Sequence, residues 1–316
     1  MIPFVYKYMP THLSEFNMQD MTQQMLRELI QSDMLNVLFV GGHSTGKTIL
    51  STIIVNEYYN GISSSKINDN ILIINSLREQ GIQYYRSDVK CFCQTKCTIP
   101  NKKKIIILDD LDIINNQNQQ IFLNYIDKYS NNVLYIATCN NSQKIIDNIH
   151  SRLSIINLSP ITNEYLSIVL RKVIQQEHIC IDEEAIQIIL SITKQSLRIM
   201  LNYLEKFKLL NIPIVRSNVY DLCTDINQQS FDSFTQYILD EDKINAIITI
   251  TSIQKEGYSV IDILDFYFIY LKCSKLQDET KYKMIKVLCK YITIFNTIHE
   301  DNIELLFLVN DLIKAQ

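Results

Sequence analysis

The chain has 316 residues, of which 47% are hydrophobic and 20% are charged, a composition typical of a globular protein with about two or three domains. Its net charge of −4 excludes nucleic-acid binding through an overall basic excess, so any such contact needs a local basic patch or a ring of subunits. No apolar run reaches the ~18 residues of a membrane span. Eight cysteines without paired spacing, in a chain that starts without a signal peptide, predict free thiols in a reducing compartment.

The first segment, 3–10, has proline at both ends and is predicted to be extended. Apolar residues at helical spacing then predict a helix over 20–33. The run Val37 to Val40 is typical of a buried parallel strand, and it leads directly into a glycine-containing loop.

This loop has the pattern of a phosphate-binding loop, with Gly41, four further residues, and then Gly46, Lys47 and Thr48. Its glycines allow backbone N–H groups to face a polyphosphate, and the N-terminus of a helix over 47–59 adds partial positive charge. We expect Lys47 to reach the terminal phosphates and the Thr48 hydroxyl to bind Mg²⁺. A chance match in a strand-to-helix turn is the weaker interpretation. The expected nucleotide contacts are Gly41, Gly42, His43, Ser44, Thr45, Gly46, Lys47, Thr48 and Ile49.

Strands and helices alternate over the following hundred residues. The expected elements are a surface loop over 61–70, strands over 71–74, 105–108, 133–138 and 155–158, and helices over 82–97 and 117–129. This alternation predicts an α/β fold in which a five-stranded parallel sheet is covered on both faces. Ligands bind beyond the carboxyl ends of such strands.

After Pro160 the strand pattern ends, and amphipathic helices are predicted over 162–178, 182–193 and 196–209. From about Asn227 to the end, at least four helical segments predict a bundle. We therefore expect a nucleotide-binding domain over 1–160, a helical lid domain over 161–225 and a helical collar over 226–316. The exposed face of the bundle is either a simple solvent boundary or, as we prefer, an oligomerisation surface.

Two carboxylates end the strand over 105–108, and an amide follows the next strand. A nucleotide site needs one acidic group near Mg²⁺ and another to orient or deprotonate the attacking water. Asp109 fits the first role and Asp110 the second, and Asn140 is placed to hold the water or the γ-phosphate. Taken singly, the aspartates fit an acidic turn and Asn140 a turn residue.

Two arginines are candidates for phosphate contact. Arg152 lies just before the last strand, where its side chain would point towards a neighbouring subunit and stabilise charge there in trans. Arg198 opens a helix of the lid, which could fold over the nucleotide. For either one alone, a solvated or salt-bridged surface arginine is the commoner explanation.

The segment around 82–104 contains three cysteines and several basic residues. Cys91, Cys93 and Cys97 offer only three ligands in a predicted helix, so zinc is the weaker interpretation. A solvated face is the default explanation of the basic residues, and phosphate contact is the more specific one. These residues are Arg86, Lys90, Lys96, Lys102, Lys103 and Lys104.

Seven short motifs occur in an order that resembles one known family. The motifs are Phe4 to Pro10, Met18-Gln19, the phosphate-binding loop with Asp109-Asp110, Asn75 to Ile82, Thr138 to Asn140, Ser151-Arg152-Leu153, and Ser196-Leu197-Arg198 with Asn202. Over residues 3–210 the chain resembles AAA+ ATPases of the sliding-clamp loader class, in particular the small subunits of replication factor C.

The resemblance implies a ring of five ATPase subunits, held by their collars, that uses ATP and Mg²⁺ to load a sliding clamp onto primer–template DNA. Nucleotide would bind at each interface, where Arg152 would reach a neighbour's site and Arg198 the chain's own nucleotide. Val5, Tyr8 and Pro10 would also belong to this nucleotide site. Arg86 and Lys90 would contact DNA, helix 117–129 would contact the clamp, and Gln119 would link this helix to the DNA-binding segment.

Several residues depart from the family pattern. Asp110 replaces a Glu, His43-Ser44 replaces Pro-Gly, and Leu153 replaces a Cys. The shorter side chain of Asp110 leaves open a subunit that binds ATP but hydrolyses it weakly. An initiator or helicase of the AAA+ class is the other alternative. The abundance of Ile and Asn fits a large DNA virus, so we expect the nucleus, the cytoplasm or a viral replication site in a host cell.

Overall fold

Five runs rich in Ile, Leu and Val form a parallel β-sheet in the part of the chain that the computed structural model describes, residues 2–75, 82–193, 195–223, 228–274, 276–295 and 301–315. The strands are β1 (Val37–Val40), β2 (Ile71–Asn75), β3 (Lys104–Asp109), β4 (Val133–Cys139) and β5 (Ser154–Asn157). Their order is β2-β3-β4-β1-β5. The carboxyl ends of β3, β4 and β1 are therefore neighbours at one edge of the sheet.

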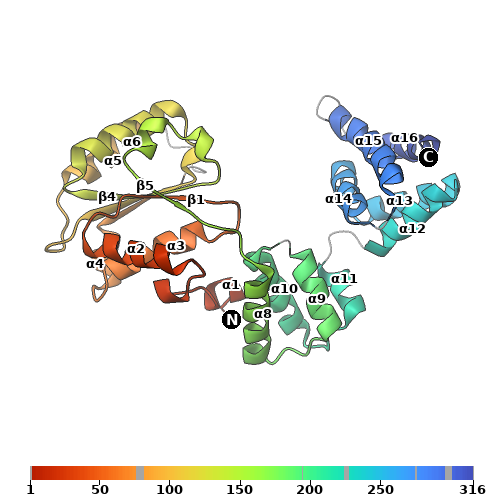
Figure 1. Cartoon of the computed structure of the whole chain (residues 1–316), viewed down its shortest axis with the longest axis horizontal. Helices are drawn as coiled ribbons and strands as arrows, with labels where there is room; N and C mark the ends of the chain where they lie inside the picture. The colour runs from red at the N-terminus through yellow and green to blue at the C-terminus, as the bar shows by residue number, and fades with distance from the viewer. Residues whose placement is uncertain are drawn as a thin grey trace. The chain divides into compact units, whose positions relative to one another are not determined.

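Helices cover both faces of this sheet, as a parallel sheet requires. Successive residues of a strand face opposite sides, so Leu38 packs into the core beneath α5 (Ile82–Gln94) and α6 (Asn116–Tyr129). Phe39 packs into the other core, beneath α2 (Asp20–Gln31) and α3 (Lys47–Tyr58). Figure 1 shows the sheet between these two helical layers. The predicted α/β architecture is confirmed.

Two local predictions in this region were wrong. The segment expected to be extended contains the short helix α1 (Phe4–Lys7), because proline restricts its own and the preceding residue but leaves the following ones free to form a turn. Phe4 is fully buried and its N–H donates to Glu205 Oε2 at 3.2 Å, which fixes the turn in place. The expected loop over 61–70 contains the helix α4 (Ser64–Asn68).

The chain forms two compact units. The first contains Met1–Cys180 and Thr193–Pro213, and the second contains Ile181–Ile192 and Ile214–Gln316. Besides the sheet and its helices, the first unit includes the helices α8 (Asn163–Glu177) and α10 (Leu197–Leu210), the short α7 (Asp147–His150), and the 3₁₀ turns η1 (Leu13–Glu15), η2 (Leu111–Ile113) and η3 (Ser142–Lys144). No further strand pairs with the sheet among the described residues.

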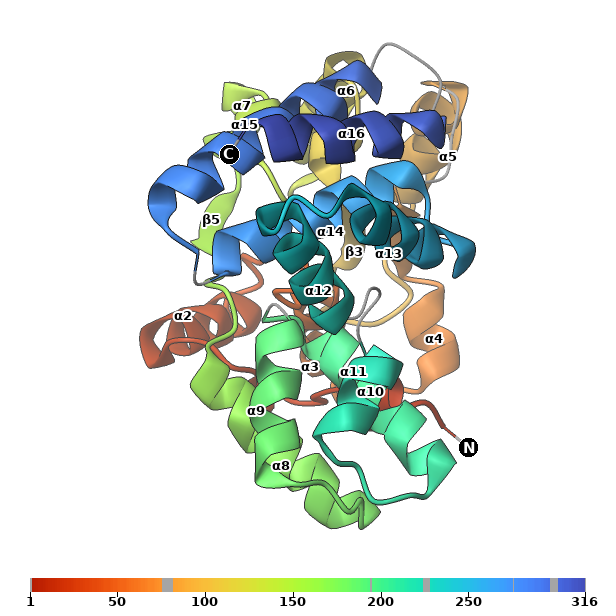
Figure 2. The same ribbon diagram turned by 90° about the vertical axis from the view of Figure 1, so that its right-hand side faces the viewer.

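The described residues of the second unit form helices, apart from one parallel bridge between Ile181 and Ile214. Its helices are α9 (Glu183–Ile192), α11 (Arg216–Cys223), α12 (Gln228–Leu239), α13 (Lys243–Lys255), α14 (Val260–Cys273), α15 (Asp278–Phe295) and α16 (Ile303–Lys314). The last five share one apolar core that includes Phe234, Tyr267 and Leu308. Figure 2 shows α15 and α16 within this bundle. The predicted C-terminal bundle is present, with five described helices where at least four were expected.

A buried glutamine joins α6 to the loops at the carboxyl edge of the sheet. Gln119 is fully buried. Its amide nitrogen donates to the carbonyl oxygens of Leu111, Ile114 and Lys144, and its Oε1 accepts the N–H of Ile146 at 3.0 Å. One side chain thus satisfies four backbone groups from two loops.

Replacing this amide with a hydrocarbon of similar size should destabilise the chain. Gln119→Leu leaves buried backbone groups unpaired, at about 1–3 kcal/mol for each group that finds no water, so we expect a loss of roughly 2–4 kcal/mol in the free energy of unfolding. Chemical denaturation measures it. The control is Gln120→Leu on the exposed face of the same helix, and an equal effect of both substitutions would contradict the role of the buried amide.

Candidate nucleotide-binding site

The predicted site residues converge at the carboxyl edge of the sheet. Val40 at the end of β1 pairs with Cys139 of β4, and Asn75 of β2 pairs with Asp109 of β3. The order of the strands therefore brings the loop after β1 beside the residues that end β3 and β4. Such an edge is where open parallel sheets bind ligands.

Lys47 lies at the centre of this arrangement and is 7% exposed. Its Nζ donates to the carbonyl oxygens of Gly41 at 2.9 Å and Gly42 at 2.7 Å, and to Asn140 Oδ1 at 2.9 Å. Burial lowers the pKa of Lys47, and the nearby carboxylate of Asp110 opposes this shift. The ammonium group thus has three acceptors that phosphate oxygens can replace.

The loop has the shape of an anion cradle. Gly46 has φ +87° and directly precedes α3, so the N-terminus of a 12-residue helix faces the loop. A Cβ on Gly41 would lie 2.9 Å from Thr45 Oγ1 and 3.0 Å from the carbonyl oxygen of Leu158, so glycine is required there. Ser44 has φ +62°, a conformation that disfavours side chains other than that of glycine. Ser44 stands where the family that the chain resembles has glycine, so this substitution lies at a strained backbone position.

Oxygen ligands suitable for Mg²⁺ lie side by side. Thr48 Oγ1 donates to Asp109 Oδ1 at 3.2 Å, and Thr138 Oγ1 donates to the same carboxylate oxygen at 2.7 Å. Mg²⁺ prefers a hydroxyl and one carboxylate combined with waters and phosphate oxygens. Thr48 and Asp109 fit this requirement, and Thr138 orients the carboxylate from behind.

Asp110 faces the same space from a left-handed backbone conformation, φ +53°. Its N–H donates to Thr138 Oγ1 at 3.0 Å, and its Oδ1 accepts Asn140 Nδ2 at 3.2 Å. Burial, followed by the charges of Asp109 and Asp112, raises the pKa of Asp110. Its carboxylate therefore has a higher proton affinity than an ordinary aspartate, as a base that handles water requires.

Asp112 is a site residue that the sequence analysis missed. Its Oδ2 accepts the backbone N–H groups of Asn140 at 3.3 Å and Asn141 at 3.1 Å, and so holds the turn that carries the Asn140 amide. Its Oδ1 is buried without a protein partner. A third carboxylate two residues after Asp110 was the available signal, but only the fold shows that it faces Asn140.

The lid residue Arg198 is exposed in the first turn of α10. Ser196, the N-cap of that helix, donates from its Oγ to Ser44 Oγ at 3.3 Å. The start of α10 thus lies beside the phosphate-binding loop. The role of Arg198 at the nucleotide stays a prediction.

The expected N-terminal contacts lie on α1 and just after it. Val5, Tyr8 and Pro10 are half-buried. Tyr8 Oη donates to Glu177 Oε1 at 2.6 Å, and Lys7 Nζ approaches the same oxygen at 2.5 Å. These bonds join α1 to α8, while the part of these residues in binding a nucleotide stays a prediction.

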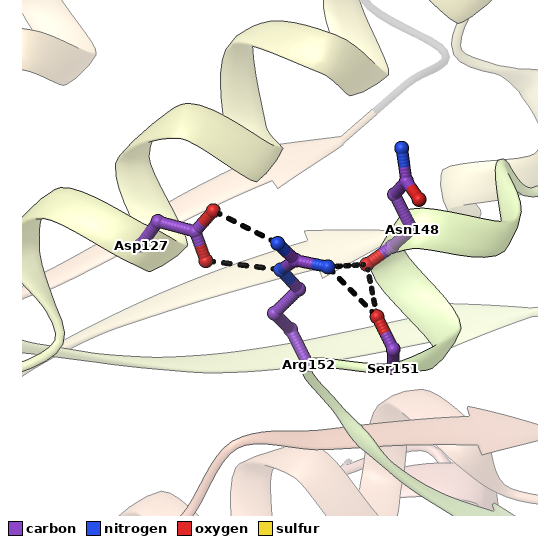
Figure 3. A network of polar contacts seen from close by, with 4 residues as sticks. All are labelled: Asp127, Asn148, Ser151 and Arg152. Atoms are coloured by element: carbon purple, nitrogen blue, oxygen red, sulfur yellow. Dashed lines mark hydrogen bonds and ion pairs between the residues drawn. The ribbon is translucent and has the colours of Figure 1, made fainter.

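Arg152 lies on the surface, and its described hydrogen bonds go to Asp127, Asn148 and Ser151 and not to the nucleotide site of its own chain. Its guanidinium pairs with Asp127 of α6, as Figure 3 shows. The expectation that it acts on a neighbouring subunit stays a prediction.

The other basic residues divide into two groups. Arg86 and Lys90 are exposed one turn apart on α5, and Lys96 is exposed just after this helix. By contrast, Lys102 lies over the ring of Tyr58, Lys103 donates to two carbonyl oxygens, and Lys104 is buried. The side chains of Lys102 to Lys104 thus serve the fold.

The three cysteines of this segment differ in exposure: Cys91 is exposed, Cys93 is buried and Cys97 is half-buried. Cys93 is buried and lies 3.8 Å from Tyr135 Oη. Among the residues with a described position, no group of three or more His, Cys, Asp or Glu side chains could hold a metal ion. The motif Asn75 to Ile82 cannot be compared, because 76–81 lie outside the described residues.

The raised pKa of Asp110 gives a prediction for the chain without nucleotide and Mg²⁺. The folded chain holds a proton here more tightly than the unfolded chain, so this group's contribution to stability is full below the ordinary pKa of 3.8 and is lost as the pH rises through the folded value. Asp110→Asn should therefore raise the Tm at neutral pH, and the gain should vanish towards pH 3. Thermal unfolding across this range tests it, with the exposed Asp69→Asn as control; a loss of Tm at pH 7 would contradict it.

Comparisons with known proteins agree with this geometry. Residues 37–161 match the profile of the ATPase family associated with various cellular activities (AAA). A protein of Acanthamoeba polyphaga mimivirus named as a replication factor C small subunit is 25% identical over 90% of this chain and 88% of the relative. Replication factor C subunit 3 of Schizosaccharomyces pombe is 29% identical, with coverage of 84% and 78%.

A structure of the Thermotoga maritima RuvB Holliday junction branch migration motor shares the fold. It has a TM-score of 0.53 and 14% identity, and the match covers 73% of this chain and 79% of that protein. The profile match, the relatives and the convergence of Lys47, Thr48, Asp109 and Asn140 lead to one conclusion. Residues 37–161 match the AAA family of ATPases, and the chain as a whole is similar to replication factor C small subunits.

Proposed function

We propose that this chain is an ATP-hydrolysing small subunit of a clamp loader. The observation that carries the proposal is that Lys47, Thr48, Asp109 and Asn140 lie together at the carboxyl edge of the sheet. This set of groups can hold a magnesium–triphosphate complex. The names of the relatives support clamp loading as the purpose of the hydrolysis.

Each residue has a distinct part in the proposed reaction. Lys47 and the N–H groups from Gly41 to Ile49 bind the phosphates, and Thr48 with Asp109 holds Mg²⁺, which neutralises phosphate charge when bound. Asp110 accepts a proton from the attacking water, and the Asn140 amide orients that water or the γ-phosphate. Arg198 from the lid and Arg152 from a neighbouring subunit stabilise the charge that develops. The side of the site near the adenine base of the nucleotide includes Val5, Tyr8 and Pro10.

Exposed apolar residues on the C-terminal bundle support assembly with other subunits. Ile244 and Ile248 are 73% and 60% exposed one turn apart on α13, and Phe307 on the contacting helix α16 is 56% exposed. Large exposed side chains at helical spacing are typical of interaction surfaces. We propose that they hold a pentameric ring. The division at 1–160, 161–225 and 226–316 then separates the ATPase domain, the lid and the collar.

The DNA and clamp contacts belong to the first unit. Arg86 and Lys90 project from the same exposed face of α5, a basic pair suited to DNA phosphates. Residues 117–129 of α6 are the proposed clamp contact. A groove of about 800 Å³ lies beside the start of this helix and is lined by Ile113, Asn116 and Lys144 among others. Gln119 is the proposed link between these regions, and its described bonds join α6 to the loops after β3 and β4.

The location proposed is a reducing compartment, either the nucleus, the cytoplasm or a viral replication site. Every cysteine whose state the structure describes is a free thiol. None of the described helices is both long and apolar enough to cross a membrane.

Lys47→Ala tests the nucleotide site. Loss of the ammonium group removes a main phosphate contact, so ATP-dependent assembly with partner subunits should be lost, and affinity for Mg·ATP should fall at least about tenfold, the effect of ~1.4 kcal/mol. Native mass spectrometry with and without Mg·ATP measures both assembly and composition. The exposed Lys172→Ala is the matched control. Unchanged ATP affinity in a folded Lys47→Ala chain would contradict the proposed nucleotide site.

Reversing the charges of Arg86 and Lys90 tests the DNA contact. Each lost phosphate contact reduces the slope of log K against log salt by about 1, so Arg86→Glu with Lys90→Glu should reduce it by about 2 and weaken binding at every sequence. Fluorescence anisotropy of the assembled complex on primer–template DNA over a salt series measures the slope. Lys66→Glu with Lys172→Glu makes the same change of charge at exposed positions elsewhere, and equal slopes for the two pairs would contradict the contact.

A further inference from the structure

We propose that Asp127 is a positioning residue for Arg152. Its carboxylate pairs with the guanidinium until a phosphate in a neighbouring subunit's site takes the place of that carboxylate. This inference rests on the proposed role of Arg152 in trans. It adds a step to that role, because the guanidinium must leave one set of partners before it can bind another.

The hydrogen bonds of Arg152 occupy all three of its nitrogens. Nε donates to Asp127 Oδ1 at 3.0 Å and Nη2 donates to Asp127 Oδ2 at 3.3 Å, a two-bond contact along one edge of the planar group. Nη1 donates to the carbonyl oxygen of Asn148 at 3.2 Å and to Ser151 Oγ at 2.8 Å. Figure 3 shows the guanidinium between these partners.

A count of donors shows why exchange is necessary. Arginine has five N–H groups in a fixed planar arrangement. Here the guanidinium donates four hydrogen bonds, to Asp127, Asn148 and Ser151. Binding a phosphate by two parallel N–H groups needs a free edge. The edge formed by Nε and Nη2 becomes free only when Asp127 is released.

The backbone on both sides of the pair is fixed. Asp127 follows the buried Ile126 on α6, and Arg152 is flanked by the buried Leu153 and follows α7, whose Ile149 is fully buried. The side chains themselves remain accessible, with Arg152 38% and Asp127 50% exposed. Anchored backbones with accessible side chains allow the pair to open without unfolding either element.

The exposure of the pair limits what it costs to open. Exposed ion pairs contribute little because water and salt screen them. A terminal phosphate carries more charge than one carboxylate and offers three oxygens, so it competes well for the same edge. Asp127 therefore restricts the side-chain conformations of Arg152 in the lone subunit, while Arg152 can still exchange this partner for phosphate in the ring.

Asp127→Asn tests this exchange, because the amide keeps the shape but removes the charge. In the ring assembled from this chain and its partner subunits, we expect kcat/KM for ATP to rise about two- to fivefold, the range of an exposed ion pair. ATP affinity of the lone subunit should not change. Asp127→Glu retains the charge and should stay near the wild type. Asp147→Asn removes an exposed carboxylate from α7, which is not a partner of Arg152, and should also have no effect.

A second measurement follows the pair directly. In nitrogen NMR of the full chain without nucleotide, the Arg152 Nε–H signal should show slow exchange with water, and Asp127→Asn should speed this exchange at least twofold. A fall in kcat/KM, or no change in either measurement for Asp127→Asn, would overturn the proposal.

The double variant separates this inference from the proposed function. With Arg152→Ala present, Asp127→Asn should add nothing, because the carboxylate acts only through the guanidinium. If Arg152→Ala alone leaves turnover of the ring unchanged, the role in trans is wrong. If Arg152→Ala lowers turnover but Asp127→Asn has no effect, only the role of Asp127 is wrong.

Discussion

The buried ammonium group of Lys47 is the constraint on which the site depends. A charge that is 7% exposed needs acceptors on all sides, and Lys47 finds them on Gly41, Gly42 and Asn140. Those acceptors come from the loop after β1 and from the end of β4, so the position of the lysine depends on the pairing of these two strands. The sheet is thus the element that keeps the charge, its amide partner and the Asp109 carboxylate within reach of one ligand.

The parts of the fold set by local patterns could be predicted from the sequence. The run from Val37 to Val40, the glycines and Lys47-Thr48 depend on residues close in the chain, so their spacing alone identified strand, loop and helix. The order in which strands alternate with helices was enough to predict the parallel sheet. Phe4 shows the limit of such patterns. Its short helix depends on a hydrogen bond to the distant Glu205 and on the burial of its side chain.

Contacts between distant segments could not be read from spacing. Asp112 follows Asp110 by two residues, yet its part in the site depends on the backbone of Asn140, 28 residues later. Asp127 and Arg152 are 25 residues apart and lie on different elements. A carboxylate on a helix surface is normally solvated, and only packing shows which one has an arginine beside it. The run from Lys102 to Lys104 is the opposite case. Its spacing suggested a solvated or phosphate-binding surface, but these side chains make contacts within the fold.

The groups to which the proposal assigns nucleotide binding and catalysis are hydrogen-bonded to other groups of the chain. Lys47 is bonded to Asn140, Thr48 to Asp109, Asp110 to Asn140 and Arg152 to Asp127. Each of these bonds involves a charged group, and each can be replaced by an oxygen of phosphate, water or metal at little cost in unpaired groups. Because Asn140 is bonded to both Lys47 and Asp110, a phosphate that takes Lys47 also changes the partner of the proposed base. In the proposed reaction, binding and activation would therefore be coupled through the Asn140 amide, whose backbone Asp112 holds.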